Sequence, residues 1–321
     1  MKPAIVLAAD QLDDAAAADV AAACDDWAAS FRRVSQTLPR GEMAALLDAT
    51  DVLVGWTDPS LLRESRVSTY LCGSAGFDAY VGIGLDRKPG FRLTNAAGVM
   101  AGTIAEHCIA LMFALVRELP TILDQQRRRQ YERRWQAREL GGSTACIVGL
   151  GAAGTALARL CRGVGMRTIG VCRTPDSHRG VTDVLHGIDA LPEAVTHADH
   201  VVSLLPGGPA TRNVFNARIF SRMKRGACYY AAGRGSVTDE DALIAALANG
   251  PLAGAGIDVF AQEPLHDASP LWTMPNVIVS PHSAGLSMSL NRRLAALFVD
   301  NLNRLRFGQP LCHEIAPRQL A

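Results

Sequence analysis

The sequence lacks the features that mark several classes of protein. Its 321 residues carry 32 Lys and Arg against 31 Asp and Glu, so no general attraction to nucleic acid or to an anionic membrane is expected. None of the eight cysteines belongs to a C-x-x-C pair or lies beside spaced histidines. This pattern indicates neither a metal site nor a disulfide framework, and it fits the reducing cytoplasm.

No stretch of the sequence predicts a membrane span or a secretory signal. The apolar run near the N-terminus ends at Asp10, which is too short for a signal peptide, and it lacks a small-residue cleavage pattern. The longest apolar helix candidate, residues 99–120, contains four polar side chains, namely Glu106, His107, Arg117 and Glu118. A membrane span excludes that many charges, so we expect a buried helix and no membrane partner.

Apolar runs and helical stretches alternate in two separate parts of the chain. Residues 4–8 and 51–56 are strand candidates, and residues 14–24 are a helix candidate. Residues 67–77 are typical of a strand that ends in a glycine-containing turn. A second series starts at residue 144, with the strand candidates TACIVGL, RTIGVC, HVVSLL, ACYYAA, AGAGIDV and NVIVSPH.

This alternation predicts an α/β fold made of two doubly wound parallel-sheet domains. A chain of 321 residues is longer than one hydrophobic core usually serves, which agrees with two domains. Leucines at helical spacing over residues 287–307 predict a last helix that returns to the first domain. We expect a flavodoxin-like substrate-binding domain of residues 1–97 and 286–321, with a Rossmann cofactor domain of residues 98–285 inserted into it.

Residues 124–139 form a polar stretch that is rich in arginine. The arginines are Arg127, Arg128, Arg129, Arg133, Arg134 and Arg138. Such a run is typical of a solvated helix face or of an arm that contacts a second copy of the chain. Nucleic-acid binding is not expected, because the run is short and the other charges are balanced.

A glycine-rich turn follows the first strand of the second series. The residues Gly149-Leu150-Gly151-Ala152-Ala153-Gly154 have the pattern G-x-G-x-x-G, which is weak evidence when it stands alone. Here the pattern follows the strand candidate TACIV and opens the helical stretch TALARLC, as in a dinucleotide-binding turn. The glycines allow the backbone to approach a pyrophosphate, and the start of the helix offers unpaired N–H groups. These residues are therefore predicted to bind a dinucleotide.

The residues at the end of the next strand candidate favour NADP. A site specific for NAD has an Asp or Glu there, about 20 residues beyond the glycines, to bind the ribose 2′-hydroxyl. This chain has Cys172, Arg173 and Thr174 instead. A guanidinium can bind a 2′-phosphate in a forked geometry, whereas a carboxylate would repel it. The alternative is that Arg173 is an ordinary surface residue and that the site accepts both cofactors.

Three polar residues, Arg234, Glu263 and His282, follow later strand candidates of the second series. Ligands of open α/β sheets bind beyond the carboxyl ends of the strands, so these side chains are expected to face a bound nicotinamide. His282 suits proton transfer, Glu263 could fix the tautomer of that imidazole, and Arg234 could hold a carboxylate. Each residue taken alone could be structural, but the ordered set predicts reduction of a 2-oxo acid.

These motifs resemble those of a known family. Along nearly its whole length the chain is similar to the D-isomer-specific 2-hydroxyacid dehydrogenases, through GLGAAG, LLPGGPATRN, AAGRGSVTDEDAL, GIDVFAQEPL and SPHSAG. The resemblance implies catalytic roles for Arg234, Glu263 and His282. It implies that the backbone of Ser74, Ala75 and Gly76 binds the substrate carboxylate. Further cofactor contacts are implied for Thr103, Leu205, Pro206, Thr211, Ala232, Gly233, Asp258 and Ser283.

Within the family, the chain looks most like the glyoxylate and hydroxypyruvate reductases. Arg173 and Thr174 support this likeness. So does Trp135, which resembles a tryptophan near the substrate pocket of such reductases, sometimes supplied by the neighbouring subunit. Trp56 is a second pocket candidate, although both tryptophans could belong to the core or to an interface. The implied protein is a homodimer that uses NADPH to reduce a small 2-oxo acid to the 2-hydroxy acid.

Two alternatives stay open from the sequence. The substrate could be a bulkier 2-oxo acid such as phenylpyruvate, because the sequence does not identify the side chain that the pocket accepts. The chain could also be a nucleotide-sensing scaffold without enzymatic activity. The intact set of Arg234, Glu263 and His282 argues against this second alternative, and detectable turnover would dismiss it.

Overall fold

The computed structural model describes residues 2–321, which fall into two compact units. The first unit runs to Met100 and resumes from Ser287 to Ala321. The second unit comprises Ala101–Leu286, so it interrupts the first in the sequence.

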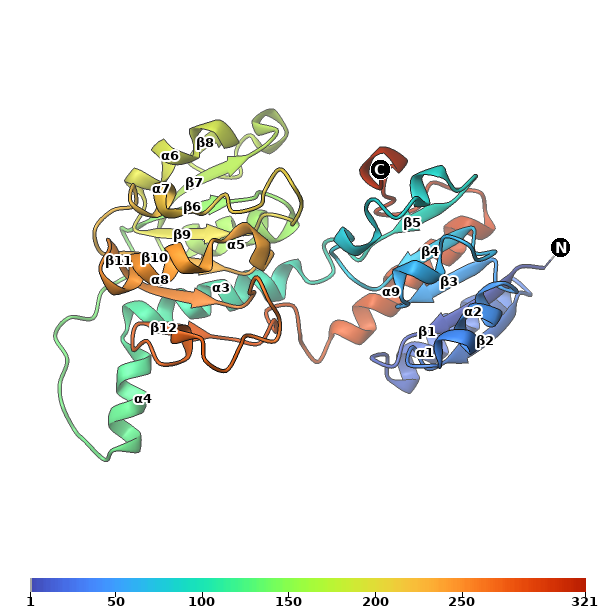
Figure 1. The fold of residues 1–321 in the computed structure, drawn as a ribbon, viewed down its shortest axis with the longest axis horizontal. Helices are drawn as coiled ribbons and strands as arrows, with labels where there is room; N and C mark the ends of the chain where they lie inside the picture. The colour runs from blue at the N-terminus through green and yellow to red at the C-terminus, as the bar shows by residue number, and fades with distance from the viewer. Residues whose placement is uncertain (1) are drawn as a thin grey trace. The chain divides into compact units, whose positions relative to one another are not determined.

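The first unit is built on a five-stranded parallel sheet with the strand order β2-β1-β3-β4-β5 (Figure 1). Its elements are β1 (Ala4–Ala8), α1 (Asp14–Asp26), β2 (Ser30–Val34), α2 (Arg40–Leu47), β3 (Val52–Gly55), β4 (Thr69–Cys72), β5 (Arg92–Thr94) and α9 (Leu290–Arg306). Successive residues of a strand point to opposite faces, so Ile5 and Leu7 pack with α1 and α9, while Val6 packs on the side of α2. Both faces are covered, which explains the unbroken apolar runs of the central strands.

The second unit is built on a seven-stranded parallel sheet with the order β12-β11-β10-β9-β6-β7-β8. Its strands are β6 (Thr144–Val148), β7 (Arg167–Cys172), β8 (Val184–Gly187), β9 (His200–Ser203), β10 (Ala227–Ala231), β11 (Leu252–Ile257) and β12 (Val277–Val279). Its helices are α3 (Ala101–Val116), α4 (Leu119–Arg127), α5 (Ala152–Gly163), α6 (Leu191–Ala194), α7 (Ala217–Phe220) and α8 (Glu240–Ala248). The order reverses between β6 and β9, which is the switch point where doubly wound sheets bind ligands.

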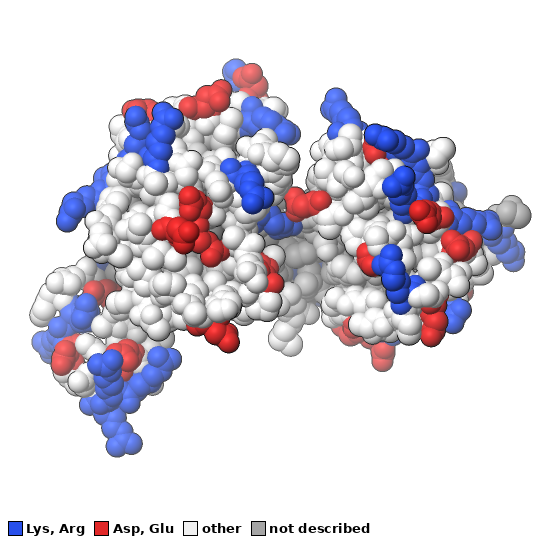
Figure 2. All heavy atoms as spheres, in the orientation of Figure 1, with Lys and Arg blue, Asp and Glu red and all other residues white. Residues whose placement is uncertain are grey.

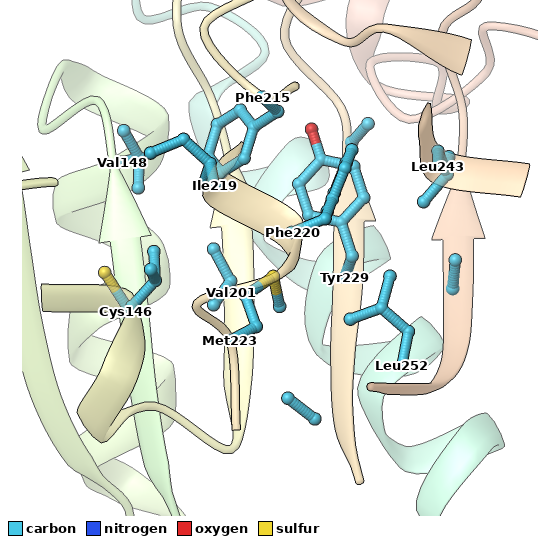
Figure 3. Packing of buried hydrophobic residues seen from close by; sticks show 14 of the residues in the cluster. Cys146, Val148, Val201, Phe215, Ile219, Phe220, Met223, Tyr229, Leu243 and Leu252 are labelled. Carbon is cyan, nitrogen blue, oxygen red and sulfur yellow. The ribbon is translucent and has the colours of Figure 1, made fainter. Parts of the chain in front are cut away.

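One face of this second sheet packs against aromatic side chains. Figure 3 shows Phe215, Phe220 and Tyr229 together over the middle of the sheet. The ring centroids of Phe215 and Tyr229 lie 4.9 Å apart, and those of Phe220 and Tyr229 lie 5.2 Å apart. This cluster fixes the central strands, whose carboxyl ends carry the motifs described above.

The structure confirms the predicted fold of two doubly wound parallel sheets and corrects its detail. Six strands were expected in the second domain, whereas the sheet has seven, and β8 was missed. The strands β2 and β5 of the first domain were missed as well. All three lie at sheet edges, where a strand has one neighbour and does not need a continuous apolar run.

A single helix was expected over residues 99–120, but the structure has two helices there. The first, α3, ends at Val116, and α4 starts at Leu119 after Glu118, whose backbone φ is +55°. Pro120 explains the break, because its ring lacks an N–H and would clash with the carbonyl group of Val116 in a continuous helix. Within residues 2–321, no helix is long and apolar enough to cross a membrane.

Candidate active site

The motifs of the second unit all lie along one edge of its sheet. Because the strands are parallel, their carboxyl ends share this edge. Along it come His282 after β12, Glu263 after β11, Arg234 after β10, the glycine turn after β6 and Arg173 after β7. The polar set thus lies toward one side of the switch point, and Arg173 lies on the other.

The glycine turn has the shape that a pyrophosphate needs. A Cβ atom on Gly154 would lie 2.0 Å from the carbonyl oxygen of Gly149, so only glycine allows this turn to close against α5. Gly149 has φ +102°, and a Cβ there would lie 2.7 Å from the carbonyl oxygen of Leu204. A Cβ on Gly151, in contrast, would meet nothing within 4 Å. The space before α5 is therefore open, and no side chain caps the helix, so its first N–H groups can bind an anion.

The end of β7 presents a cation without a competing carboxylate. Arg173 and Thr174 are exposed, whereas Cys172 is buried. Within residues 2–321, the Arg173 guanidinium makes no hydrogen bond or ion pair. The carboxylate of Asp176 binds Arg179, with 2.6 Å between Oδ1 and Nη2. Arg173 is therefore available to bind a phosphate.

The loop after β9 is closed by its own hydroxyl group. Thr211 Oγ1 donates to the carbonyl oxygen of Pro206 at 2.7 Å, so this side chain holds the loop in shape. Leu205 is buried beneath the loop, and Pro206 is exposed. A Cβ on Gly233 would lie 2.5 Å from the Leu205 carbonyl oxygen. The loops after β9 and β10 therefore pack so closely that only glycine fits at position 233.

The structure brings Glu263 and His282 into direct contact. Glu263 Oε2 lies 2.7 Å from His282 Nδ1, and both side chains are partly exposed, at 36% and 49%. An ionised carboxylate only accepts hydrogen bonds, so Nδ1 carries the proton and Nε2 is left to face solvent or a ligand. The backbone N–H of Phe260 donates to the other carboxylate oxygen of Glu263 at 3.0 Å and so orients it.

A buried carboxylate organises the segment that carries His282. Asp258 is 0% exposed, and it accepts hydrogen bonds from the backbone N–H of Ser283 at 2.9 Å and of Ala284 at 3.0 Å. The N–H of His282 donates to the carbonyl oxygen of Asp258 at 2.9 Å. His282 itself has φ +51°, a conformation that costs free energy in a non-glycine residue and that the surrounding contacts must hold. Asp258, for which the resemblance implies a cofactor contact, also anchors the His282 segment.

Arg234 is held between two glycines that admit no side chain. Besides the contact of Gly233, a Cβ on Gly235 would lie 1.8 Å from the carbonyl oxygen of Phe260. The segment of Arg234 therefore packs directly against the loop that leads to Glu263. The guanidinium is half-buried, and its Nη1 donates to the Gly233 carbonyl oxygen at 2.8 Å. Ala232 is buried just before it.

The predicted carboxylate-binding turn lies in the first unit, after β4. Trp56 Nε1 donates to Ser74 Oγ at 2.9 Å, and Asn95 Nδ2 donates to the Ala75 carbonyl oxygen at 2.6 Å. These bonds fix the turn while leaving it half-exposed. Within residues 2–321, the N–H groups of Ala75 and Gly76 donate to no other group, so they could receive a carboxylate. Trp56 braces this turn, and its ring fills the space beside Gly73.

Trp135, the second predicted pocket tryptophan, is a surface residue of the single chain. It lies in the segment after α4 and is 86% exposed. Sequence reasoning also missed His107 and Ser280, whose side chains lie 3.0 Å apart next to Asp258. His107 comes four residues after Thr103 on α3, and this helical spacing could have placed both on one face. Thr103 Oγ1 donates to the Gly285 carbonyl oxygen at 3.3 Å.

Comparison with known proteins identifies the family. The model of the D-isomer-specific 2-hydroxyacid dehydrogenase NAD-binding domain matches residues 109–284, over half of the chain. The chain belongs to this family. The matched residues lie within the second unit, so this unit of the dehydrogenase is its dinucleotide-binding domain.

Individual relatives agree with this assignment. A glycerate dehydrogenase of Methylorubrum extorquens is 32% identical to this chain. The matched region covers 70% of this chain and 71% of the relative. A glyoxylate/hydroxypyruvate reductase B of Salmonella newport is 35% identical to this chain. The matched region covers 65% of this chain and 66% of the relative, which is just under two thirds of each. A crystal structure of a D-isomer-specific 2-hydroxyacid dehydrogenase from Xanthobacter autotrophicus, in complex with NADPH and MES, covers 100% of both chains with a TM-score of 0.82 and 27% identity.

Proposed function

We propose that this dehydrogenase works as a reductase that uses NADPH to convert a small 2-oxo acid, of the glyoxylate or hydroxypyruvate type, into the 2-hydroxy acid. The contact between Glu263 and His282 carries this proposal, because it leaves His282 Nε2 available for proton transfer. Relatives that are named glycerate dehydrogenase and glyoxylate/hydroxypyruvate reductase support the substrate class. All eight cysteines are free thiols, which suits work in the cytoplasm.

In this proposal the polar residues divide the work of the reduction. When bound, the nicotinamide supplies the hydride. His282 protonates the carbonyl oxygen through Nε2, while Glu263 holds the ring and stabilises the imidazolium. Arg234 binds the carboxylate and polarises the carbonyl group. For the turn of Ser74, Ala75 and Gly76 in the first unit, binding of a substrate carboxylate through backbone N–H groups stays a prediction.

The cofactor would be held by residues of the second unit. The first turn of α5 would bind the pyrophosphate, since Gly151 leaves that space open. The contacts of the cofactor with Thr103, Leu205, Ala232, Asp258 and Ser283 stay predictions. Pro206, Thr211, Gly233 and Thr174 complete the predicted set. Asp258 already accepts hydrogen bonds from Ser280, Ser283 and Ala284, so a contact with the cofactor must use a lone pair of the carboxylate that these bonds do not occupy.

The first test is the loss of absorbance of the reduced nicotinamide. NADPH and NADH are each offered with glyoxylate, hydroxypyruvate, pyruvate and phenylpyruvate. Fast oxidation of NADPH by glyoxylate or hydroxypyruvate would support the proposal. Preference for phenylpyruvate would support the bulkier substrate, and turnover with none of the four would favour a nucleotide-sensing role.

Arg173 tests the preference for NADPH. The change Arg173→Ala removes the guanidinium proposed to bind the 2′-phosphate, and a hydrogen bond to a charged group contributes about 1.5–3 kcal/mol. We expect kcat/KM with NADPH to fall about 30-fold, while kcat/KM with NADH stays within about 2-fold. Arg179→Ala is the matched control, because that arginine is paired with Asp176. Equal losses with both cofactors would contradict the assignment.

We also propose that the dehydrogenase is a homodimer held through the arm around α4. Exposed apolar side chains gather there: Leu119, Ile122, Leu123, Tyr131 and Trp135. The base of the arm is fastened, since the Arg138 N–H donates to the Val116 carbonyl oxygen at 2.8 Å. Arg134 also binds Glu118 through two hydrogen bonds of 2.8 and 2.9 Å. Figure 2 shows basic side chains at the end that Figure 1 labels α4.

An acidic residue on the apolar side of α4 tests this dimer. Leu123 is 49% exposed, and burying a charge in its place should separate the subunits. Light scattering after size exclusion should give about twice 34.2 kDa for the wild type and 34.2 kDa for Leu123→Asp. Gln125→Asp adds the same charge on another side of the helix and should leave the mass unchanged. A wild-type monomer, or a dimer in both variants, would refute this interface.

A further inference from the structure

A chain of hydrogen bonds leads from helix α3 to the segment of His282. His107 Nε2 lies 3.0 Å from Ser280 Oγ, and Ser280 Oγ lies 2.6 Å from Asp258 Oδ1. The same carboxylate oxygen accepts from the N–H of Ser283, next to His282. His107 comes from α3, Asp258 follows β11 and Ser280 follows β12, so the chain joins three separate elements of the second unit.

The direction of each bond follows from the number of protons available. The carboxylate of Asp258 accepts, so the single hydroxyl proton of Ser280 points to it. Ser280 Oγ must then accept from His107, which places a proton on Nε2 of that ring. The two bonds are partly buried, and in such a setting a series of hydrogen bonds polarises along its length, so that each bond strengthens the next.

This series of hydrogen bonds matters for the His282 segment because it ends on the buried carboxylate of Asp258. Asp258 is 0% exposed, and His107 Nε2 lies 3.7 Å from its Oδ1. Burial, together with the charge of Asp258, raises the pKa of the neighbouring Cys108 thiol to about 12, so this thiol stays neutral. A buried carboxylate depends on every hydrogen-bond donor it has, because a buried charge without partners costs free energy, so weakening the bond from Ser280 affects the bonds that remain. Here the donors at risk are the N–H groups that hold the His282 segment.

We propose that His107 is a positioning residue of the reductase, which acts through Ser280 and Asp258 to hold His282 in its productive place. This inference rests on the proposed role of His282 as proton donor. His282 has φ +51°, so its backbone does not keep this conformation without support. His107 does not touch the ring of His282, and its effect passes through the buried carboxylate. The imidazole of His282 is then held in two ways. Glu263 binds its Nδ1, and Asp258 holds the backbone beside it.

Two substitutions of His107 separate positioning from mere packing. His107→Gln keeps an N–H donor at the end of the side chain, whereas His107→Leu removes the donor and keeps an apolar side chain of similar reach. We expect kcat of His107→Leu to fall about 10-fold, the value of one hydrogen bond of 1.4 kcal/mol. His107→Gln, which restores an N–H donor, should recover most of kcat. Equal losses in both variants, or an unchanged kcat in His107→Leu, would overturn the proposal.

Ser280 offers a second pair in case the His107 variants do not fold. Ser280→Thr keeps the hydroxyl and Ser280→Ala removes it, so only the alanine variant should lose kcat. Adding His107→Leu to Ser280→Ala should then cause little further loss of kcat, because both changes break the same series of hydrogen bonds. Losses of kcat that multiply in the double variant would show that the two residues act separately, against the proposal.

A spectroscopic measurement tests the network without turnover. Selective ¹⁵N labelling of the eight histidines gives separate ring signals, and the signal of His282 is assigned by its loss in His282→Asn. We expect the Nδ1–H signal bound to Glu263 to weaken or shift in His107→Leu and to persist in His107→Gln. The same signal in all variants would sink the network. If the wild type reduces no 2-oxo acid, the proposed function fails, while this comparison still decides about His107.

Discussion

Replacing His282 with alanine is expected to lower kcat for reduction of the 2-oxo acid by at least about 100-fold, the scale of general acid catalysis. The reason is the geometry of the ring. Glu263 holds Nδ1 at 2.7 Å, so Nε2 is the atom left to protonate the carbonyl oxygen. The measurement is steady-state oxidation of NADPH, together with the Kd of NADPH, which should stay nearly constant.

Two further variants make this result specific. His197→Ala is the matched control, since that side chain is 65% exposed and precedes β9, at the amino edge of the sheet. It should retain wild-type kcat. Glu263→Gln keeps the shape of the carboxylate but removes its charge, so the imidazolium loses its stabilisation and kcat should fall about 10-fold or more. Near-normal turnover of His282→Ala would show that the proton comes from another group.

The sequence predicts the central strands of both sheets but not their edges. Central strands of a parallel sheet are buried on both faces, so β6, β9 and β10 appear as apolar runs. The edge strand β2 has the sequence SFRRV, and all five of its residues are exposed or half-exposed. Its pairing with β1 comes from main-chain hydrogen bonds, which leave no pattern in the side chains.

The same distinction applies to the candidate site. Arg234, Glu263 and His282 could be found because the carboxyl ends of strands mark where ligands bind. The contacts that hold them could not, because Gly235 against Phe260, or Ser280 against Asp258, join residues distant in sequence. Asp258 shows the limit of reading a motif, since its burial and three of its hydrogen bonds became visible only in the folded chain.

Replacing Arg234 with glutamine is expected to lower kcat/KM for the 2-oxo acid by at least about 100-fold. A guanidinium can give a carboxylate two parallel charge-assisted hydrogen bonds, each contributing about 1.5–3 kcal/mol. Glutamine keeps part of the length and a donor but carries no charge. The rate should fall through both KM and kcat, because the proposed role includes binding the carboxylate and stabilising charge on the carbonyl oxygen.

A lysine at the same position separates charge from geometry. Arg234→Lys keeps the charge as a single point and loses the planar fork, so it should recover only part of the rate, about 10-fold over glutamine. Arg222→Gln is the control, because Arg222 is exposed and precedes β10, at the opposite edge of the sheet. Full activity in Arg234→Lys would mean that a charge alone suffices. Full activity in Arg234→Gln would show that Arg234 does not bind the carboxylate, against the proposed role.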